Sequence, residues 1–165
     1  MALFPMCVDL SDQAVLVVGE GPEADSKAAK MAPFCKTVLR CPYPPEYDAA
    51  PALVILAQKD HPDNESLAAH FRSLHIPVNV ADRPELCDFR FPSLITRGDV
   101  TVSLTTGGKA PVLGTLLRER IECALPEDLE AIAQTAAELT ARLRQSTPDP
   151  RERTRLLREL LRKVL

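Results

Sequence analysis

The stretch Ala14-Val-Leu-Val-Val-Gly-Glu-Gly-Pro-Glu-Ala24 decides the fold of this chain. Its apolar residues run directly into Gly19-x-Gly21-x-x-Ala24, and the helix-favouring run Asp25–Met31 follows at once. This order predicts a buried strand, a tight turn and the start of a helix. In such a turn the first glycine permits the bend, the second lets the backbone approach a pyrophosphate, and the small third residue allows close packing. Taken alone, the motif fits a dinucleotide site and a plain strand–helix turn equally well.

Composition limits the size and the class of the protein. With 165 residues, 45% of them hydrophobic, the chain suits one compact domain with or without a small helical addition. The net charge of −3 argues against a broad basic surface, so we expect no nucleic-acid partner. No apolar run approaches the roughly 18–20 residues of a membrane span, and we expect no membrane partner. The first five residues lack the basic and apolar regions of a signal peptide.

The cysteines and histidines lack the spacing of a metal site. The five cysteines are odd in number, widely separated and form no Cys-x-x-Cys pair, which favours neither a zinc site nor a disulfide framework. We therefore expect mostly buried thiols in a reducing cytoplasm. The three histidines are also scattered, so we predict no metal.

Strands and helices alternate through the first half of the chain. The first helix should end near Ala32, before Pro33. We expect Ser11–Gln13 to form a turn before the first strand and Pro42–Asp48 to form a loop. The remaining predicted elements are strands at Lys36–Cys41, Ala52–Ala57 and Ile76–Ala81, and a helix from about Asp63 to Leu74. This alternation indicates an α/β fold with a parallel, Rossmann-like sheet.

The pattern changes after Asp82. Asp88–Ile95 and Val100–Thr105 alternate apolar and polar residues around the turn Arg97–Asp99, which predicts a β-hairpin. The rest of the chain is predicted to be helical. The first helix runs from Pro111 to about Leu125, and an apolar stripe over Leu129–Leu143 indicates a second. The last helix begins at the cap Asp149-Pro-Arg-Glu152, and its apolar stripe extends to Val164.

Five motifs occur in an order that resembles one family. They are Phe4-Pro…Val8-Asp-Leu10, Val15-Leu-Val-Val-Gly-x-Gly, Val78-Asn-Val-Ala-Asp82, Leu86-Cys-Asp-Phe-x-Phe-Pro92 and Thr105-Thr-Gly-Gly-Lys-Ala-Pro111. Together they resemble the precorrin-2 dehydrogenase family, which includes the amino-terminal part of siroheme synthase. The resemblance implies NAD-dependent oxidation of precorrin-2 to sirohydrochlorin by a homodimer, with iron insertion in some members. It also implies a Rossmann-like dinucleotide-binding domain at 1–82, a β region for dimerisation and the active site at 83–112, and a helical region at 113–165.

The resemblance assigns the role of general base to Asp82. The assignment agrees with physical expectation, because a carboxylate just past a parallel strand lies where α/β sheets bind ligands. Loss of a hydride leaves a cation that must release a proton, and one placed carboxylate can accept it. From the local sequence alone, Asp82 fits a solvated loop residue or a cap as well.

The resemblance also assigns residues to the cofactor and the substrate. The cofactor residues are Gly19, Gly21, Pro22, Glu23 and Ala24, with Pro42 and Tyr43 lying against the adenosine. The substrate residues are Thr105, Thr106, Gly107, Gly108, Lys109 and Arg83. Cations are needed there because the tetrapyrrole is rich in carboxylates. Arg90, Arg97 and Arg118 are further candidates. We expect at least half of all these cations to face solvent.

The chain departs from the family pattern at the nucleotide side. The segment between Pro42 and Ala52 is shorter than usual, so we expect a sheet reduced by about one strand–helix unit. About 20 residues beyond Gly19, where an acid binds the ribose of NAD, stand Leu39 and Arg40, and an arginine there favours a 2′-phosphate. NADP therefore remains open beside NAD. Three alternative functions also remain open: a non-catalytic tetrapyrrole-binding protein, a sirohydrochlorin ferrochelatase with weak or lost dehydrogenase activity, and an unrelated Rossmann-type regulatory module that binds no tetrapyrrole.

Overall fold

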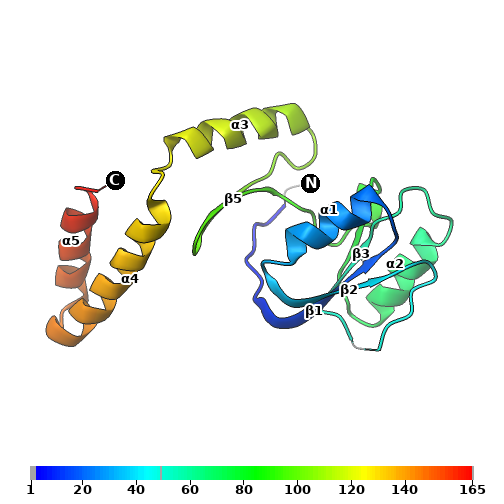
Figure 1. Ribbon diagram of the computed structural model, residues 1–165, viewed down its shortest axis with the longest axis horizontal. Helices are drawn as coiled ribbons and strands as arrows, with labels where there is room; N and C mark the ends of the chain where they lie inside the picture. The colour runs from blue at the N-terminus through cyan, green and yellow to red at the C-terminus, as the bar shows by residue number, and fades with distance from the viewer. Residues whose placement is uncertain (1–2, 49, 165) are drawn as a thin grey trace. The chain divides into compact units, whose positions relative to one another are not determined.

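The computed structural model describes residues 3–48 and 50–164, which fall into two compact units. One unit contains residues 4–91, and the other contains the chain from Pro92 onward. Figure 1 shows both units, with labels on the helices α1–α5 and the strands β1, β2, β3 and β5.

Within the described residues, the first unit is a four-stranded parallel sheet with helices α1 and α2. Its elements are β1 (Leu10–Val18), α1 (Pro22–Met31), β2 (Cys35–Cys41), β3 (Leu53–Leu56), α2 (Asn64–Ser73), β4 (Val78–Val80) and the 3₁₀ helix η1 (Pro84–Leu86). The strand order is β2-β1-β3-β4, so β1 and β3 lie in the centre. The predicted parallel, Rossmann-like sheet is confirmed.

Each face of the sheet is covered by one helix (Figure 1). Leu16 and Val18 of β1 pack in one cluster with Phe71 of α2. Val17 packs on the opposite face in a cluster with Ala24 of α1. All five residues are fully buried. Burial on both faces explains why β1 is a continuous apolar run rather than an alternating one.

The connection from β2 to β3 is short. Its described residues, 42–48 and 50–52, contain neither a helix nor a strand. The predicted shortening of the sheet by about one strand–helix unit is therefore confirmed.

Two local predictions in the first unit are wrong. Ser11–Gln13 belongs to β1 instead of forming a separate turn, although the pairing with β2 shifts register between Leu10 and Ala14. The turn-like signal has a local cause, because the Asp9 carboxylate accepts hydrogen bonds from the N–H and hydroxyl of Ser11 at 3.0 and 2.7 Å.

The second wrong prediction is the early start of the hairpin strand. The chain over Asp88–Pro92 follows β4 without becoming a strand. The Asp88 N–H donates to the carbonyl oxygen of Val78 at 2.8 Å, and the Asp88 carboxylate accepts the Val78 N–H at 3.0 Å. A side chain thus takes the place of one main-chain acceptor.

The second unit combines a β-hairpin with three helices in its described part (Figure 1). Its elements are β5 (Ser93–Arg97), β6 (Val100–Leu104), α3 (Pro111–Ala124), α4 (Leu129–Ser146) and α5 (Pro150–Leu161). The strands are antiparallel, as predicted. The predicted cap of α5 is also present, because the Asp149 carboxylate accepts the N–H of Arg151 at 2.9 Å. The apolar stripe of the last helix was expected to reach Val164, but α5 ends at Leu161.

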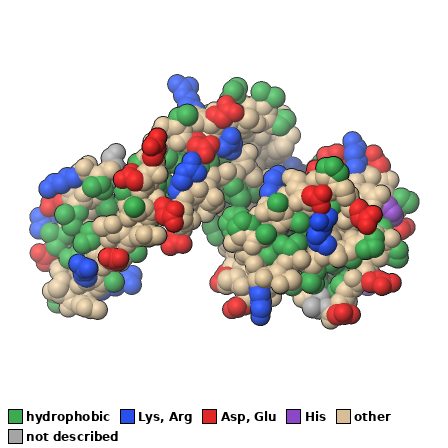
Figure 2. Space-filling view, in the orientation of Figure 1, with side chains coloured by type: hydrophobic (Ala, Val, Ile, Leu, Met, Phe, Trp, Pro, Cys, Tyr) green, Lys and Arg blue, Asp and Glu red, His purple; other side chains and the backbone are tan. Residues whose placement is uncertain are grey.

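The surface carries charges of both signs. Figure 2 shows acidic and basic side chains interspersed on the face in view. Among the described residues, no helix has both the length and the apolar character needed to cross a bilayer.

Candidate functional site

The loops after the four parallel strands meet at one edge of the sheet, here called the carboxyl edge. Gly19 follows β1, Pro42 follows β2, Gln58 comes two residues after β3, and Asp82 comes two residues after β4. Because parallel strands all end at the same edge, the loops there are brought together from distant parts of the sequence. Ligands of open α/β sheets bind at this edge.

Gly19 makes the sharp bend that ends β1. Its φ is +119°, and its N–H donates to the carbonyl oxygen of Cys41 at 2.9 Å. A Cβ at this position would lie 3.3 Å from the backbone nitrogen of Gln58 and 3.4 Å from Cε2 of Tyr43. Both the backbone conformation and the tight contact therefore require glycine here.

Gly21 leaves open space at the start of α1. Its φ is +84°, and a Cβ built on it would meet no atom within 4 Å. The first intrahelical donor is the Asp25 N–H, which bonds to the Gly21 carbonyl at 3.0 Å. Pro22 has no N–H, so the unsatisfied first-turn donors are those of Glu23 and Ala24. Ala24 is fully buried, but open space beside the N–H of the exposed Glu23, at the positive end of the helix, fits the approach of a phosphate.

Tyr43 anchors the loop after β2 to the loop after β3. Its hydroxyl donates to Oδ1 of the fully buried Asn64 at 2.7 Å, and Nδ2 of Asn64 donates to the Gln58 carbonyl at 3.0 Å. The Tyr43 ring stacks on His61 with centroids 3.9 Å apart. Burial raises the pKa of Tyr43 to about 12, so the phenol stays protonated and remains a donor. This network fixes the surface against which Gly19 packs.

Three members of this network, Asn64, Gln58 and His61, were not among the predicted site residues. No role at the site was predicted for Asn64 and Gln58, and His61 was one of the three scattered histidines. The sequence did contain a signal for Asn64, because an amide side chain at the first position of a helix is well placed to form hydrogen bonds with nearby loops. Pro42, the other predicted residue of this loop, is exposed beside Tyr43.

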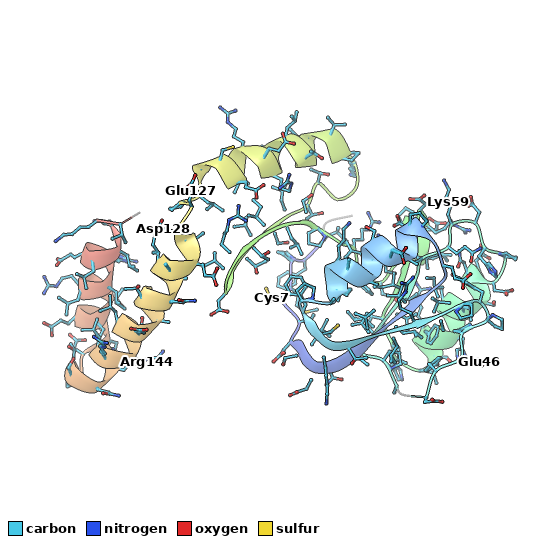
Figure 3. All side chains as sticks on the ribbon, viewed as in Figure 1. Cys7, Glu46, Lys59, Glu127, Asp128 and Arg144 are labelled. Atoms are coloured by element: carbon cyan, nitrogen blue, oxygen red, sulfur yellow. The ribbon has the colours of Figure 1, made fainter. Side chains whose placement is uncertain are left out.

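Asp82 lies at the same edge in a left-handed backbone conformation. Its φ is +58°, and its side chain is 68% exposed. Nζ of Lys59, labelled in Figure 3, lies 3.4 Å from Oδ2 of Asp82. Lys59 directly follows Gln58, which packs against Gly19. The loop after β3 thus connects the glycine bend to the carboxylate.

Arg83 is already paired with acids. Nη2 lies 2.8 Å from Oε1 of Glu65, and Nε donates to Glu85. The hydrogen bonds to Glu85 and Glu65 raise the pKa of Arg83 and keep it charged. A substrate carboxylate at this position would have to exchange with one of these partners.

The predicted polar turn Thr105–Lys109 belongs to the second unit. The Thr105 hydroxyl oxygen accepts the Gly107 N–H at 3.1 Å, and both glycines have positive φ, +65° and +77°. Thr106 packs towards α3, since its Cγ2 lies 3.5 Å from the position of a Cβ on Gly114. The turn is therefore a defined local structure that directs its outer groups to solvent.

The cations of the second unit differ in their pairing. Lys109 is exposed. Nη2 of Arg97 lies 2.9 Å from Oε1 of Glu122, and Nη1 of Arg118 lies 2.5 Å from Oε2 of the same carboxylate. Hydrogen bonds from Arg97 and Arg118 lower the pKa of Glu122. Arg97 of β5 thus joins the hairpin to α3, whereas Arg118 pairs with Glu122 within α3 itself, and both arginines are structural residues in this unit.

Among residues 3–48 and 50–164, no three His, Cys, Asp or Glu side chains come together to hold a metal ion. The five cysteines are free thiols, but the prediction that most of them are buried is wrong: Cys41 is buried, Cys35 and Cys87 are partly exposed, and Cys7 and Cys123 are exposed.

Comparison with known proteins places the chain beside one group of enzymes. The sequence profile of a family described as "Putative NAD(P)-binding" matches residues 41–93. Siroheme synthase of Methylococcus capsulatus is 46% identical over 101 residues, covering 61% of this chain and 21% of that protein. Siroheme synthase of Thioalkalivibrio sulfidiphilus is 34% identical over 183 residues, covering 98% of this chain and 37% of that protein.

A solved structure shows the same fold. The structure of SirC, precorrin-2 dehydrogenase, superposes with a TM-score of 0.71 over 96% of this chain and 89% of that chain, at 16% identity. The curated relatives are longer, and the chain spans between 20% and 40% of their length.

Proposed function

The chain belongs to the precorrin-2 dehydrogenase and siroheme synthase family, and on this premise we propose that it oxidises precorrin-2 to sirohydrochlorin with a nicotinamide dinucleotide. The observation that supports the proposal most directly is the composition of the carboxyl edge. A glycine bend with open space at Gly21 and the carboxylate of Asp82 stand on loops joined through Lys59. A hydride acceptor and a proton acceptor are the two groups that this oxidation needs.

The residues of the glycine bend fit the dinucleotide. Gly19 makes the bend, Gly21 leaves room for the pyrophosphate, and the first-turn N–H of the exposed Glu23 is available to it. Pro42 and Tyr43, on the loop after β2, would lie against the adenosine. When bound, the nicotinamide ring supplies the hydride-accepting chemistry.

Asp82 is the general base in this proposal. Once the hydride has left, the substrate cation loses a proton, which passes to a carboxylate oxygen of Asp82. Lys59 lies 3.4 Å from that carboxylate and restricts its orientation. The exposed position of Asp82 leaves it accessible to a large substrate.

The turn Thr105–Lys109 and Arg83 would bind the carboxylates of the tetrapyrrole. The turn offers two hydroxyls and the ammonium group of Lys109. The guanidinium of Arg83 is suited to paired contacts with a carboxylate, which would replace its contact with Glu65 or Glu85.

Turnover by an Asp82→Asn variant tests the proposal. Asparagine tolerates a left-handed backbone, so the substitution at φ +58° removes the base with little strain. We expect formation of sirohydrochlorin, followed by absorbance, to fall by about 10²–10⁴-fold while nucleotide affinity stays unchanged. Asp60→Asn is the matched control, because Asp60 is exposed and has a φ of +53° in the neighbouring loop.

The other outcomes identify the alternatives. Binding of precorrin-2 without turnover by the native chain would indicate a non-catalytic tetrapyrrole-binding protein. Iron insertion into sirohydrochlorin that proceeds without nucleotide would indicate a ferrochelatase. Full activity of Asp82→Asn would remove Asp82 from the mechanism.

We also propose that the protein is a homodimer of the cytoplasm. Helix α3 exposes one apolar face, formed by Val112, Leu113, Leu116 and Leu117. Burial of this face against a second copy would remove it from water. The free thiols agree with a reducing compartment. Light scattering tests the dimer, and Leu116→Glu should shift it towards monomer.

A further inference from the structure

We propose that Arg40 binds a 2′-phosphate and that the nucleotide site prefers NADP to NAD. This inference rests on the proposed function and specifies its cofactor. Arg40 is the next-to-last residue of β2, beside the bend at Gly19–Ala24.

The register of the sheet determines the face on which Arg40 lies. Arg40 is directly opposite Val17 in the parallel pairing of β1 and β2. Residues opposite each other in neighbouring strands project to the same face, and Val17 packs in the cluster that includes Ala24 of α1. Arg40 therefore lies on the α1 face, near the carboxyl edge.

An ion pair holds the guanidinium beside the glycine bend. Nη2 of Arg40 lies 2.7 Å from Oδ1 of Asp25. Asp25 is in the first turn of α1, and its N–H bonds to the carbonyl of Gly21. In dinucleotide-binding domains, the ribose of the adenosine lies between the glycine turn and the end of the second strand. The guanidinium thus stands where the 2′ position of that ribose is expected.

The chemistry at the end of β2 favours a phosphate over a hydroxyl. Sites for NAD place an acid there to accept the 2′-hydroxyl, whereas an arginine accommodates a 2′-phosphate. In this chain β2 ends with Arg40 and Cys41, and Pro42 follows, so no acid occupies these positions. Arg40 is 44% exposed, and its forked group has five donors, of which the contact with Asp25 occupies one side.

Asp25, in the first turn of α1, contacts Arg40 and could compete with a phosphate for its guanidinium. It orients the guanidinium, but its carboxylate could instead accept a ribose hydroxyl and favour NAD. Asp25→Asn separates the two roles. If Asp25 only orients Arg40, the variant binds NAD like the native chain, whereas a ribose-binding Asp25 would make it lose NAD.

Calorimetric titration of the full chain with NADP, NAD and 2′,5′-ADP tests the proposal. The last compound carries the 2′-phosphate without a nicotinamide. We expect NADP to bind about tenfold or more tightly than NAD, which is the effect of one good contact with a charged group. Arg40→Gln should remove that advantage and the binding of 2′,5′-ADP, while NAD affinity stays unchanged. Lys36→Gln is the matched control, an exposed cation earlier on β2, and should change neither.

The outcomes separate the inference from the proposed function. Equal or tighter binding of NAD, or unchanged NADP affinity in Arg40→Gln, would overturn the inference and leave the dinucleotide site in place. Failure of the native chain to bind any of the three nucleotides would overturn the dinucleotide site itself, and the inference with it. Thermal unfolding of each variant confirms that it is folded.

Discussion

Replacement of Gly21 by alanine should separate the backbone role of this glycine from its ligand role. The native φ of +84° and ψ of −173° lie in a region that is essentially restricted to glycine. A residue with a Cβ held there costs about 1–3 kcal/mol. The new Cβ would meet no atom within 4 Å, so no steric term adds to this strain. We therefore expect the free energy of unfolding to fall by about 1–3 kcal/mol, measured by urea denaturation.

Nucleotide affinity should fall by more than the strain explains. The Cβ of the variant occupies the open space through which a phosphate would approach the N–H of Glu23. We expect the dissociation constant for NADP or NAD, measured on folded protein by calorimetry, to rise by about tenfold or more, the equivalent of one lost charged contact.

Gly107→Ala is the control for the nucleotide measurement. Gly107 also has a positive φ, +65°, and a Cβ there would also meet no atom within 4 Å. The left-handed conformation should cost about 1–2 kcal/mol of stability. Because this turn is in the other unit and outside the proposed nucleotide site, nucleotide affinity should not change. Unaltered nucleotide binding by Gly21→Ala would refute the assignment of this open space to the pyrophosphate.

Three further changes test the structure around the site. Tyr43→Phe should lower the free energy of unfolding by about 1–3 kcal/mol in urea, because it leaves the buried Oδ1 of Asn64 without its donor; an equally stable variant would contradict this. Phe71→Ala should cost about 3–5 kcal/mol in the same assay, because the ring is fully buried between α2 and the sheet. Arg97→Gln should raise the pKa of Glu122, measured by NMR, because it removes the main cause of its lowered value. A carboxyl group whose pKa is lowered in the folded state stabilises the fold at pH values above its ordinary pKa of 4.5, and this stabilisation is lost as the pH falls. The variant should therefore unfold at a higher pH than the native chain during acid denaturation.

The sequence predicts most of the fold because its strongest signals are local. The apolar runs at Ala14–Val18 and Ala52–Ala57 are too short for helices and too apolar for a surface, so only buried parallel strands fit them. The cap at Asp149 is equally local, because one carboxylate and one nearby N–H form it. No knowledge of the tertiary structure is needed for either.

The errors occur where a local pattern has two structural explanations. Alternation over Asp88–Ile95 indicated a strand. Phe89 and Phe91 do pack against the core on the α1 face, as that alternation requires. The backbone hydrogen bonds of a strand are nevertheless replaced by the carboxylate of Asp88 and its contact with Val78. Periodicity reports which side chains are buried, and it cannot report which atoms satisfy the backbone.

The candidate site cannot be predicted from its residues alone, because it also depends on the order of the strands in the sheet. Gly19 and Asp82 can be identified in the sequence, but the link between them depends on β3 lying between β1 and β4. That order brings Gln58 against Gly19 and the next residue, Lys59, to the carboxylate of Asp82. Lys59 carries no local signal for this role, because the carboxylate that it contacts lies in another loop. In the fold it is the residue that couples the bend to the proposed base, and only the strand order reveals that connection.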